Sequence, residues 1–356
     1  MDRRLLLLPL LIAASCGRGD APAGQSAAGT NRDSAAGSVA TTPNAPGGAS
    51  STAASLTASP TASPTASPTT TGSPLPANPQ GRIPVLEYHV IGGDKNSLYT
   101  RTVASYRNDL ETAYKLGYRP ITISQMLDKD FRDVPPGMSP VVVVFDDASD
   151  SQFRYIERDG KLVVDPTSGL GIWEDFARTH PGWKPRGVFC LLNGAAAGHN
   201  FFGDNPKYGG QKKEWRFQKV KYLADQGYEL CDHTVWHARL DKFPDAVVQE
   251  QIARNLMGID SAVPGYKVRT MALPYGIWPK NRPLAWQGSW TDPKTGKTHE
   301  YKFDAVLEVA GGPTRSPYDP QFNPKSVSRI EAIGDDIVKT LTRLDASKTR
   351  FVVGAK

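Results

Sequence analysis

From residue 83 onward, short apolar runs alternate with longer segments in which apolar residues recur every three or four positions. Continuous or alternating apolar runs of four to seven residues are typical of strands, and the three-to-four spacing is typical of amphipathic helices. The runs predict strands at 83–89, 118–121, 139–145, 187–192, 228–231, 268–273 and 303–309. The spacing predicts helices at 103–116, 214–226, 245–259 and 333–344.

The order of these elements indicates the fold class. Strands that alternate with helices form parallel βα units, so the class is α/β. The run SPVVVVF at 139–145 has the apolar character of a parallel strand buried on both faces. Six or seven such units in one chain favour a closed barrel over an open sheet.

Three stretches interrupt the pattern and are interpreted as insertions. Segment 157–185 contains a hairpin signal at Asp159-Gly160 and a short helix near Trp173, segment 199–213 is rich in Gly, Asn and Lys, and segment 286–301 contains a hairpin around Thr295-Gly296. Loops that follow barrel strands lie on the catalytic face. We therefore expect these insertions to wall a cleft.

The first eighty residues have a different composition. Residues 1–15 (MDRRLLLLPLLIAAS) have the charged start and short apolar run of a signal peptide. Cys16 follows as at bacterial lipoprotein cleavage sites, which predicts a lipid on its thiol and an anchor in a membrane. The alternative is an ordinary signal peptide with an incidental cysteine, because Ala13 stands where leucine is usual.

Residues 16–80 consist mainly of Ala, Gly, Ser, Thr and Pro, without an aromatic residue, and repeat TASP three times at 57–68. Such a segment buries too little apolar surface to offset its chain entropy. The prediction is a disordered linker at 16–80 that tethers a barrel domain at 81–356.

Charge and cysteine usage narrow the choice of partners. The chain has 42 Lys+Arg against 36 Asp+Glu, a net charge of +6, without the clustered basic runs of a nucleic-acid-binding protein. We expect no nucleic acid and a monomer. Besides Cys16, only Cys190 and Cys231 remain, both in predicted strands, either as buried thiols or as a disulfide.

Two segments carry candidate chemistry. Asp146 and Asp147 end a buried strand, where adjacent carboxylates are unfavourable unless a cation faces them; the alternative is a solvated turn in which Asp147 caps the next helix. His233 and His237 are four apart, so on one helical turn both could reach one metal. The alternative there is a pair of surface or capping histidines.

The two segments complement each other. Two imidazoles and one carboxylate make a three-ligand metal site with positions open for water and substrate. The other aspartate is then free to act as a base. The sequence does not rank Asp146 against Asp147 for these roles, and Thr234 stands where a zincin has its glutamate base.

Phe145-Asp146-Asp147 and the segment His233–His237 resemble the first two motifs of the NodB-homology polysaccharide deacetylases, carbohydrate esterase family 4. The resemblance covers roughly 83–330 and implies an irregular (β/α)7 barrel. It assigns Asp146 as the base and Asp147, His233 and His237 as ligands of a divalent metal, usually zinc. The implied reaction is removal of N-acetyl groups from a polysaccharide at the cell envelope or outside the cell.

A third segment, Leu273-Pro274-Tyr275-Gly276, resembles the family motif in which the tyrosine N–H contributes to the oxyanion hole. Many members carry an arginine two residues before that proline, where it orients the base. This chain has Ala272 there, so we expect Asp146 to lack that partner, although Arg269 is near in sequence. Ala148 also replaces the usual glycine after the aspartates.

The segment Pro84-Val85-Leu86-Glu87-Tyr88-His89 resembles the opening of the deacetylases that act on poly-β-1,6-N-acetylglucosamine, in which the order of motifs is permuted. There the early histidine is the acid, a role that falls on His89; the alternative is a structural histidine at a strand end. Trp236 and Trp278 are either sugar-stacking residues or core.

Three rival functions stay open. They are an O-acetyl polysaccharide esterase, a non-catalytic glycan-binding lipoprotein and a metal-dependent hydrolase of small amides. The substitutions at 148 and 272 favour the non-catalytic protein, because each departs from the family pattern beside the site.

Overall fold

The computed structural model describes residues 75–194, 200–203 and 211–355. The predicted signal peptide, Cys16 and most of the predicted linker lie outside the described residues, as does much of the insertion at 199–213. Residues 75–80, which the prediction placed in the linker, lie along the domain, since Asn78 pairs with Val352 in an isolated β-bridge.

Within the described residues, seven parallel strands close into a barrel, which confirms the predicted (β/α)7 class. The ring closes because β2 pairs with β6 on one side and with β16 on the other. Its strands in spatial order are β2 (Val85–Tyr88), β16 (Val327–Glu331), β14 (Ala305–Gly311), β11 (Thr270–Ala272), β10 (Glu229–Asp232), β9 (Val188–Leu191) and β6 (Ser139–Phe145).

One barrel strand differs from the prediction. The expected strand at 118–121 exists as β5 (Tyr118–Pro120), but it pairs only with the first residues of β6, and the ring closes without it. The seventh barrel strand is β16, which the apolar pattern did not predict. Its sequence VSRIE carries Arg329 among its buried residues, so it lacks the apolar run of its neighbours.

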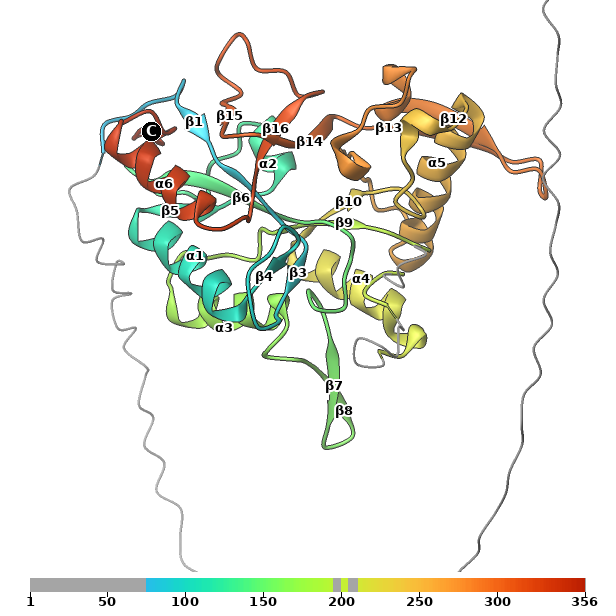
Figure 1. Ribbon diagram of the computed structural model, residues 1–356, viewed down its shortest axis with the longest axis horizontal. Coiled ribbons are helices and arrows are strands. Elements are labelled where there is room, and N and C mark those ends of the chain that lie inside the picture. The colour runs from blue at the N-terminus through green and yellow to red at the C-terminus, as the bar shows by residue number, and fades with distance from the viewer. Residues whose placement is uncertain (1–74, 195–199, 204–210, 356) are drawn as a thin grey trace, which may run out of the picture. The chain divides into compact units, whose positions relative to one another are not determined.

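Helices surround the barrel (Figure 1). They are α1 (Val103–Lys115), α2 (Ile123–Leu127), α3 (Gly169–Thr179), α4 (Arg216–Gln226), α5 (Asp245–Ala262) and α6 (Asp336–Ala346). Four predicted helices are confirmed to within a few residues, and α4 ends at Gly227, whose φ of 91° suits glycine. The helices α2 and α3 complete the set, and α3 contains the short helix expected near Trp173.

The remaining strands are short and lie outside the ring. They are β1 (Arg82–Ile83), β3 (Val90–Ile91), β4 (Thr100–Arg101), β7 (Tyr155–Arg158), β8 (Lys161–Val164), β12 (Gln287–Thr291), β13 (Thr298–Lys302) and β15 (Thr314–Arg315). The pairs β7–β8 and β12–β13 are the two predicted hairpins, and both project from the body of the domain in Figure 1.

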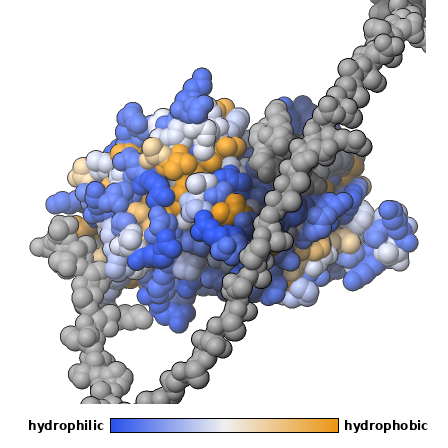
Figure 2. All heavy atoms as spheres, turned by 90° about the horizontal axis from the view of Figure 1, so that it is seen from below, coloured by the Kyte–Doolittle hydropathy of each residue, from blue (hydrophilic) through white to orange (hydrophobic). Residues whose placement is uncertain are grey.

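Two apolar clusters explain why the barrel strands are buried on both faces. In β6, Val141, Val143 and Phe145 point outward into the layer beneath the helices. Val142 and Val144 point into the barrel, where they meet Cys190, Cys231 and Leu307. The surface contrasts with this apolar interior. In Figure 2 the face seen from below is largely hydrophilic around a small hydrophobic patch.

Cys190 and Cys231 are paired in a disulfide between β9 and β10, where they are directly opposite each other. This settles the alternative that the sequence left open. Across the described residues, none of the helices has the length and apolar character needed to span a membrane.

Candidate active site

The side chains that carry candidate chemistry gather at the carboxyl ends of the barrel strands, where catalytic groups of such barrels lie. They line a pocket of about 220 Å³. Its lining residues are Glu87, His89, Tyr99, Asp146, Asp147, His233, His237, Leu273, Tyr275, Val309 and Glu331. The expected walls are wrong for this pocket, because no described residue of the three insertions is among its lining.

Asp146 and Asp147 follow β6 directly, and the backbone turns sharply after them. Asp147 has φ 75° and the buried Ala148 has φ 48°, a left-handed conformation that costs non-glycine residues about 1–2 kcal/mol. This explains why glycine is the usual residue at position 148. The turn directs the two carboxylates to different partners.

His233 and His237 follow β10, but not on the helical turn that their spacing suggested. The segment between them is an irregular loop in which Thr234 has φ 69° and His237 has φ 58°. The buried Asp232 accepts a hydrogen bond from the Thr234 backbone N–H at 2.8 Å and so fixes the start of the loop. The two imidazole rings end 4.9 Å apart.

The two segments converge on one point. Oδ1 of Asp147 lies 3.4 Å from Nε2 of His233 and 3.6 Å from Nε2 of His237. In a tetrahedral site with bonds of about 2.0–2.1 Å, ligand atoms are roughly 3.4 Å apart. Asp147 Oδ1 and His233 Nε2 are buried and lack hydrogen-bond partners, which fits a cation between them.

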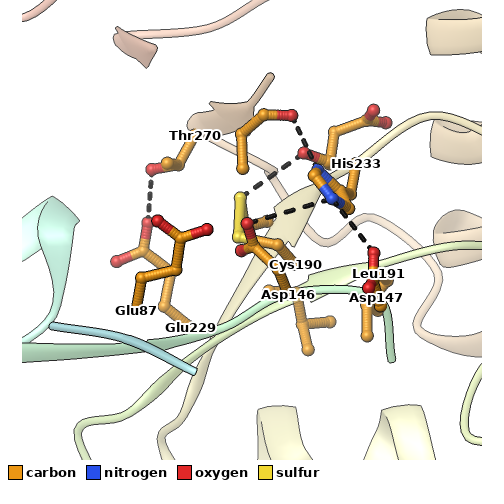
Figure 3. Close-up of a disulfide and its surroundings, with 12 residues drawn as sticks. Glu87, Asp146, Asp147, Cys190, Leu191, Glu229, His233 and Thr270 are labelled. Carbon is orange, nitrogen blue, oxygen red and sulfur yellow. Dashed lines mark hydrogen bonds and ion pairs between the residues drawn. A yellow bond between two sulfur atoms is a disulfide. The ribbon is translucent and has the colours of Figure 1, made fainter. Parts of the chain in front are cut away.

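The orientation of His233 supports the same reading. Its Nδ1 lies 2.8 Å from the carbonyl oxygen of Ala272, so Nδ1 donates there and Nε2 faces the carboxylates. Figure 3 shows His233 directed toward both aspartates, with the Cys190–Cys231 disulfide beside Asp146. Backbone contacts therefore orient this ring before any metal binds.

The two carboxylates and the two imidazoles shift one another's pKa values. Burial alone would lower the pKa of His233, but Asp146 and Asp147 outweigh it and raise the pKa to about 9. For Asp147, burial is outweighed by His233, which lowers its pKa. Burial and the positive His233 lower the pKa of His237 to about 4.

Asp146 has a partner that the sequence analysis missed. Nη1 of Arg329, on β16, donates to Oδ1 at 2.9 Å and to Oδ2 at 2.8 Å, and both side chains are buried. Burial would raise the pKa of Asp146, but Arg329 and His233 outweigh it and lower the pKa. Asp146 therefore lacks an arginine at position 272, as expected, but an arginine from another strand contacts it instead.

The arginine comes from β16, which only β2 separates from β6 in the ring. Ala272, on β11, is fully buried in the barrel interior. Arg269 points elsewhere, to Asp128 and Asp304. The sequence signal for this partner was Arg329 itself. It could not be used because β16 was not predicted as a strand.

His89 follows β2 and lies in the pocket with Glu87, two residues earlier on the same strand. Its Nε2 is 3.5 Å from Oε1 of Glu87, and the Tyr99 ring packs edge-on at 5.2 Å. Burial lowers the pKa of His89, against the opposing effect of Asp146 and Asp147. The structure therefore brings His89 to the same pocket as both aspartates.

The segment with Tyr275 forms a short 3₁₀ helix at Pro274–Gly276 on the rim. Tyr275 has φ 57° and its ring lies 4.2 Å from that of His237. Gly276 has φ 64°, and a Cβ there would be 2.8 Å from Cβ of Val309, so only glycine fits. This close approach holds the turn against β14.

The two tryptophans differ in their surroundings. Trp236 is exposed, in the loop between His233 and His237, and stacks on Phe243 with ring centroids 6.2 Å apart. Trp278 is covered by the Arg282 guanidinium at 3.9 Å and donates to Glu308. Only Trp236 remains a candidate for sugar stacking.

Comparisons with known proteins agree with this site. Residues 188–286 match the family model described as polysaccharide deacetylase, a range that includes both histidines and Tyr275 but not the aspartates. No curated protein matches the chain. The predicted resemblance to this family is confirmed.

Solved structures extend the likeness to most of the domain. BA0330 from Bacillus anthracis is 15% identical, with a TM-score of 0.51 over 74% of this chain and 69% of that one. The Streptococcus pyogenes deacetylase PplD in complex with acetate is 14% identical, with a TM-score of 0.50 over 74% and 98%. The Bacillus cereus polysaccharide deacetylase BC0361 is 14% identical, with a TM-score of 0.50 over 75% and 69%. At these identities the likeness shows the fold.

Proposed function

From the relationship to the polysaccharide deacetylases, we propose that this chain is a metal-dependent hydrolase that removes N-acetyl groups from an N-acetylglucosamine-containing polysaccharide. One observation carries the proposal. Oδ1 of Asp147 lies 3.4 Å from Nε2 of His233 and 3.6 Å from Nε2 of His237. Beside them is a second aspartate, Asp146, which is paired with Arg329. A three-ligand site with an adjacent base is the arrangement needed for metal-assisted hydrolysis.

The residues divide the work as follows. A divalent cation held by Asp147, His233 and His237, which we propose is Zn²⁺, would lower the pKa of a water and polarise the acetyl carbonyl. Asp146, held ionised by Arg329, accepts the proton of the attacking water. The Tyr275 N–H stabilises the negative charge that develops on the carbonyl oxygen.

His89 completes the reaction. It donates a proton to the nitrogen as the C–N bond breaks, which gives acetate and a free amine. Asp146 and His89 both line the pocket, so base and acid can act on one bound acetamide. The proton that Asp146 gained then restores His89.

The test is acetate release by the purified protein, with and without added Zn²⁺. The substrates are N-acetylglucosamine oligomers with β-1,4 or β-1,6 linkages, peptidoglycan, O-acetylated glycans and the N-acetylglucosamine monomer. We expect metal-dependent release from N-acetylated oligomers. Release from O-acetylated glycans alone would identify an esterase, release from the monomer alone a small-amide hydrolase, and binding without release a glycan-binding protein.

We propose further that the protein acts at the cell envelope, anchored by a lipid on Cys16. The Cys190–Cys231 disulfide supports an oxidising compartment of this kind. Replacing Cys16 by alanine and measuring partition into membrane and soluble fractions tests the anchor. An unchanged distribution would exclude it.

A further inference from the structure

Glu87 is a buried carboxylate that the proposed reaction leaves without a role. It is 1% exposed, and neither of its carboxylate oxygens has a hydrogen-bond partner. Burial raises the pKa of Glu87 to about 8. A buried carboxylate without hydrogen bonds is costly, so its neighbours indicate what it does.

Its two oxygens face two different groups. Oε1 lies 3.5 Å from Nε2 of His89, and Oε2 lies 3.3 Å from Nε of Arg329. Residues two apart on a strand point to the same side, so β2 directs both Glu87 and His89 into the barrel end. The carboxylate therefore stands between the imidazole and the guanidinium that holds Asp146.

A second metal site is the first possibility to weigh. Ligand atoms of Glu87, His89 and Asp146 lie within 4.8 Å of one another. However, Arg329 contacts both carboxylates and already supplies a positive charge there. The three carboxylates of Glu87, Asp146 and Asp147 are balanced by this arginine and one divalent cation, so a second cation would leave excess positive charge in a buried site.

This balance also sets the ionisation of Glu87. A divalent cation at Asp147, His233 and His237 adds positive charge nearby and favours the ionised carboxylate. The other ionisable groups around His89 are Tyr99; Arg329 and Glu331 on β16; Asp146 and Asp147 after β6; and His233 after β10. Among the described residues, Glu87 forms an ion pair with the ring, at 3.5 Å from Nε2.

We propose that Glu87 is a positioning residue that acts through His89, by orienting the imidazole and supplying the counter-charge of its protonated form. This inference rests on the proposed function. An imidazole has two nitrogens, so when Nε2 faces Glu87, the other is left for the leaving amine. Without the carboxylate, burial would leave His89 neutral, and a neutral ring has no extra proton to give.

The first experiment separates the acid step from the rest of the reaction. Zn²⁺-loaded wild type, Glu87→Gln, Glu87→Asp and His89→Asn are compared on an N-acetylglucosamine oligomer and on 4-nitrophenyl acetate, whose phenolate leaves without protonation. We expect Glu87→Gln to lower kcat for the oligomer by about 10–100-fold, with KM unchanged. Its activity on the ester should stay within about 2-fold, and Glu87→Asp should restore part of kcat.

The second experiment does not depend on turnover. NMR titration of ¹⁵N-labelled histidines in the Zn²⁺-loaded protein, with the His89 signal identified from His89→Asn, should show a lower His89 pKa in Glu87→Gln, by about one unit. Bound Zn²⁺ should remain one per chain in both proteins, which also shows that the variant is folded.

Each other outcome is decisive. An unchanged His89 pKa, or equal losses on both substrates, would overturn the inference and place Glu87 with Arg329 and Asp146. Two Zn²⁺ per wild-type chain and one in Glu87→Gln would overturn it in favour of a second metal site. The His89 pKa could be lower in Glu87→Gln than in the wild type while the wild type releases no acetate. This result would support the Glu87–His89 pair and refute the proposed function.

Discussion

Nη1 of Arg329 lies 2.9 Å from Oδ1 and 2.8 Å from Oδ2 of Asp146, although 183 positions separate the two residues in the chain. This contact keeps the proposed base ionised in a fully buried position. It also removes the strongest argument for an inactive protein, because the residue absent at position 272 is compensated from β16.

Asp146→Asn should abolish turnover and leave metal binding intact. Asparagine keeps the size of the side chain but cannot accept the proton of water, and removal of a general base typically costs about 10²–10⁴-fold in rate. Acetate release and Zn²⁺ stoichiometry are measured on the same sample. Substantial residual activity would exclude Asp146 as the base.

Arg329→Ala should lower both kcat and stability. It leaves Asp146 and Glu87 as uncompensated buried charges, which typically costs about 3–5 kcal/mol. Adding Ala272→Arg in the same chain should recover part of kcat, since position 272 also faces the barrel interior. Denaturant unfolding and kcat are the measurements.

Arg269→Gln is the matched control for Arg329. Arg269 pairs with Asp128 and Asp304, away from the pocket, so activity should stay at the wild-type level. If this variant lost activity as Arg329→Ala does, the loss could not be attributed to the Asp146 contact.

Metal affinity should rise with pH up to about 9. The pKa of His233 is raised to about 9, so at neutral pH a cation must displace its proton; His237, with a pKa of about 4, is already neutral. Below pH 9 protons therefore compete with the metal. Calorimetry in buffers of different ionisation enthalpy should show release of at least one proton per Zn²⁺ at pH 7, and a pH-independent affinity would contradict this.

The raised pKa of His233 also affects the stability of the metal-free protein, which should fall as pH rises while metal affinity increases. A raised folded-state pKa of His233 stabilises the fold fully below the unfolded value of about 6.5, and this contribution is lost as pH rises through 9. Hence the benefit of added Zn²⁺ to Tm should be larger at pH 9 than at pH 6. Thermal unfolding with and without metal at both pH values measures it.

Gly276→Ala should disrupt the turn that carries Tyr275. The new methyl group would meet Val309 at 2.8 Å, so the turn must move, and overpacking of this kind costs about 1–3 kcal/mol. We expect a lower kcat as well as a lower Tm. Gly296→Ala is the control: φ is 68° there too, but no atom lies within 4 Å of the added carbon, so kcat should not change.

Replacing Cys190 and Cys231 together by alanine should destabilise the domain by about 2–4 kcal/mol. The disulfide joins the centres of β9 and β10, just before His233, so Zn²⁺ affinity should fall as well. Unfolding free energy and Zn²⁺ titration test this. Free thiols at these positions in the unreduced, denatured protein would show that the bond is not formed.

The sequence predicted those parts of the fold that are determined by local periodicity or by a run of apolar residues. SPVVVVF had to be a buried strand, and the helix periodicities placed four helices correctly. β16 was missed because its inward-facing Arg329 belongs to the site and interrupts the apolar pattern. Polar residues in a barrel interior are informative only after the other strands are known.

The convergence of the candidate residues was predictable, but its geometry was not. The structure brings Asp147, His233 and His237 together as expected, while their roles stay proposals. Left-handed conformations at Thr234 and His237 could not be foreseen, because β-branched and bulky residues rarely adopt them, so the predicted helical turn was wrong. The disulfide depended on the register of β9 against β10, which no local pattern determines.

The ring closes through the pairing of β16 with β2, where Glu331 lies opposite Glu87. The base therefore receives its arginine only when nearly the whole domain has emerged and folded. A chain that ended before β16 would still contain Asp147, His233 and His237, but Asp146 would have no arginine beside it and the ring would stay open. The last barrel strand therefore completes the fold and the pocket in one step.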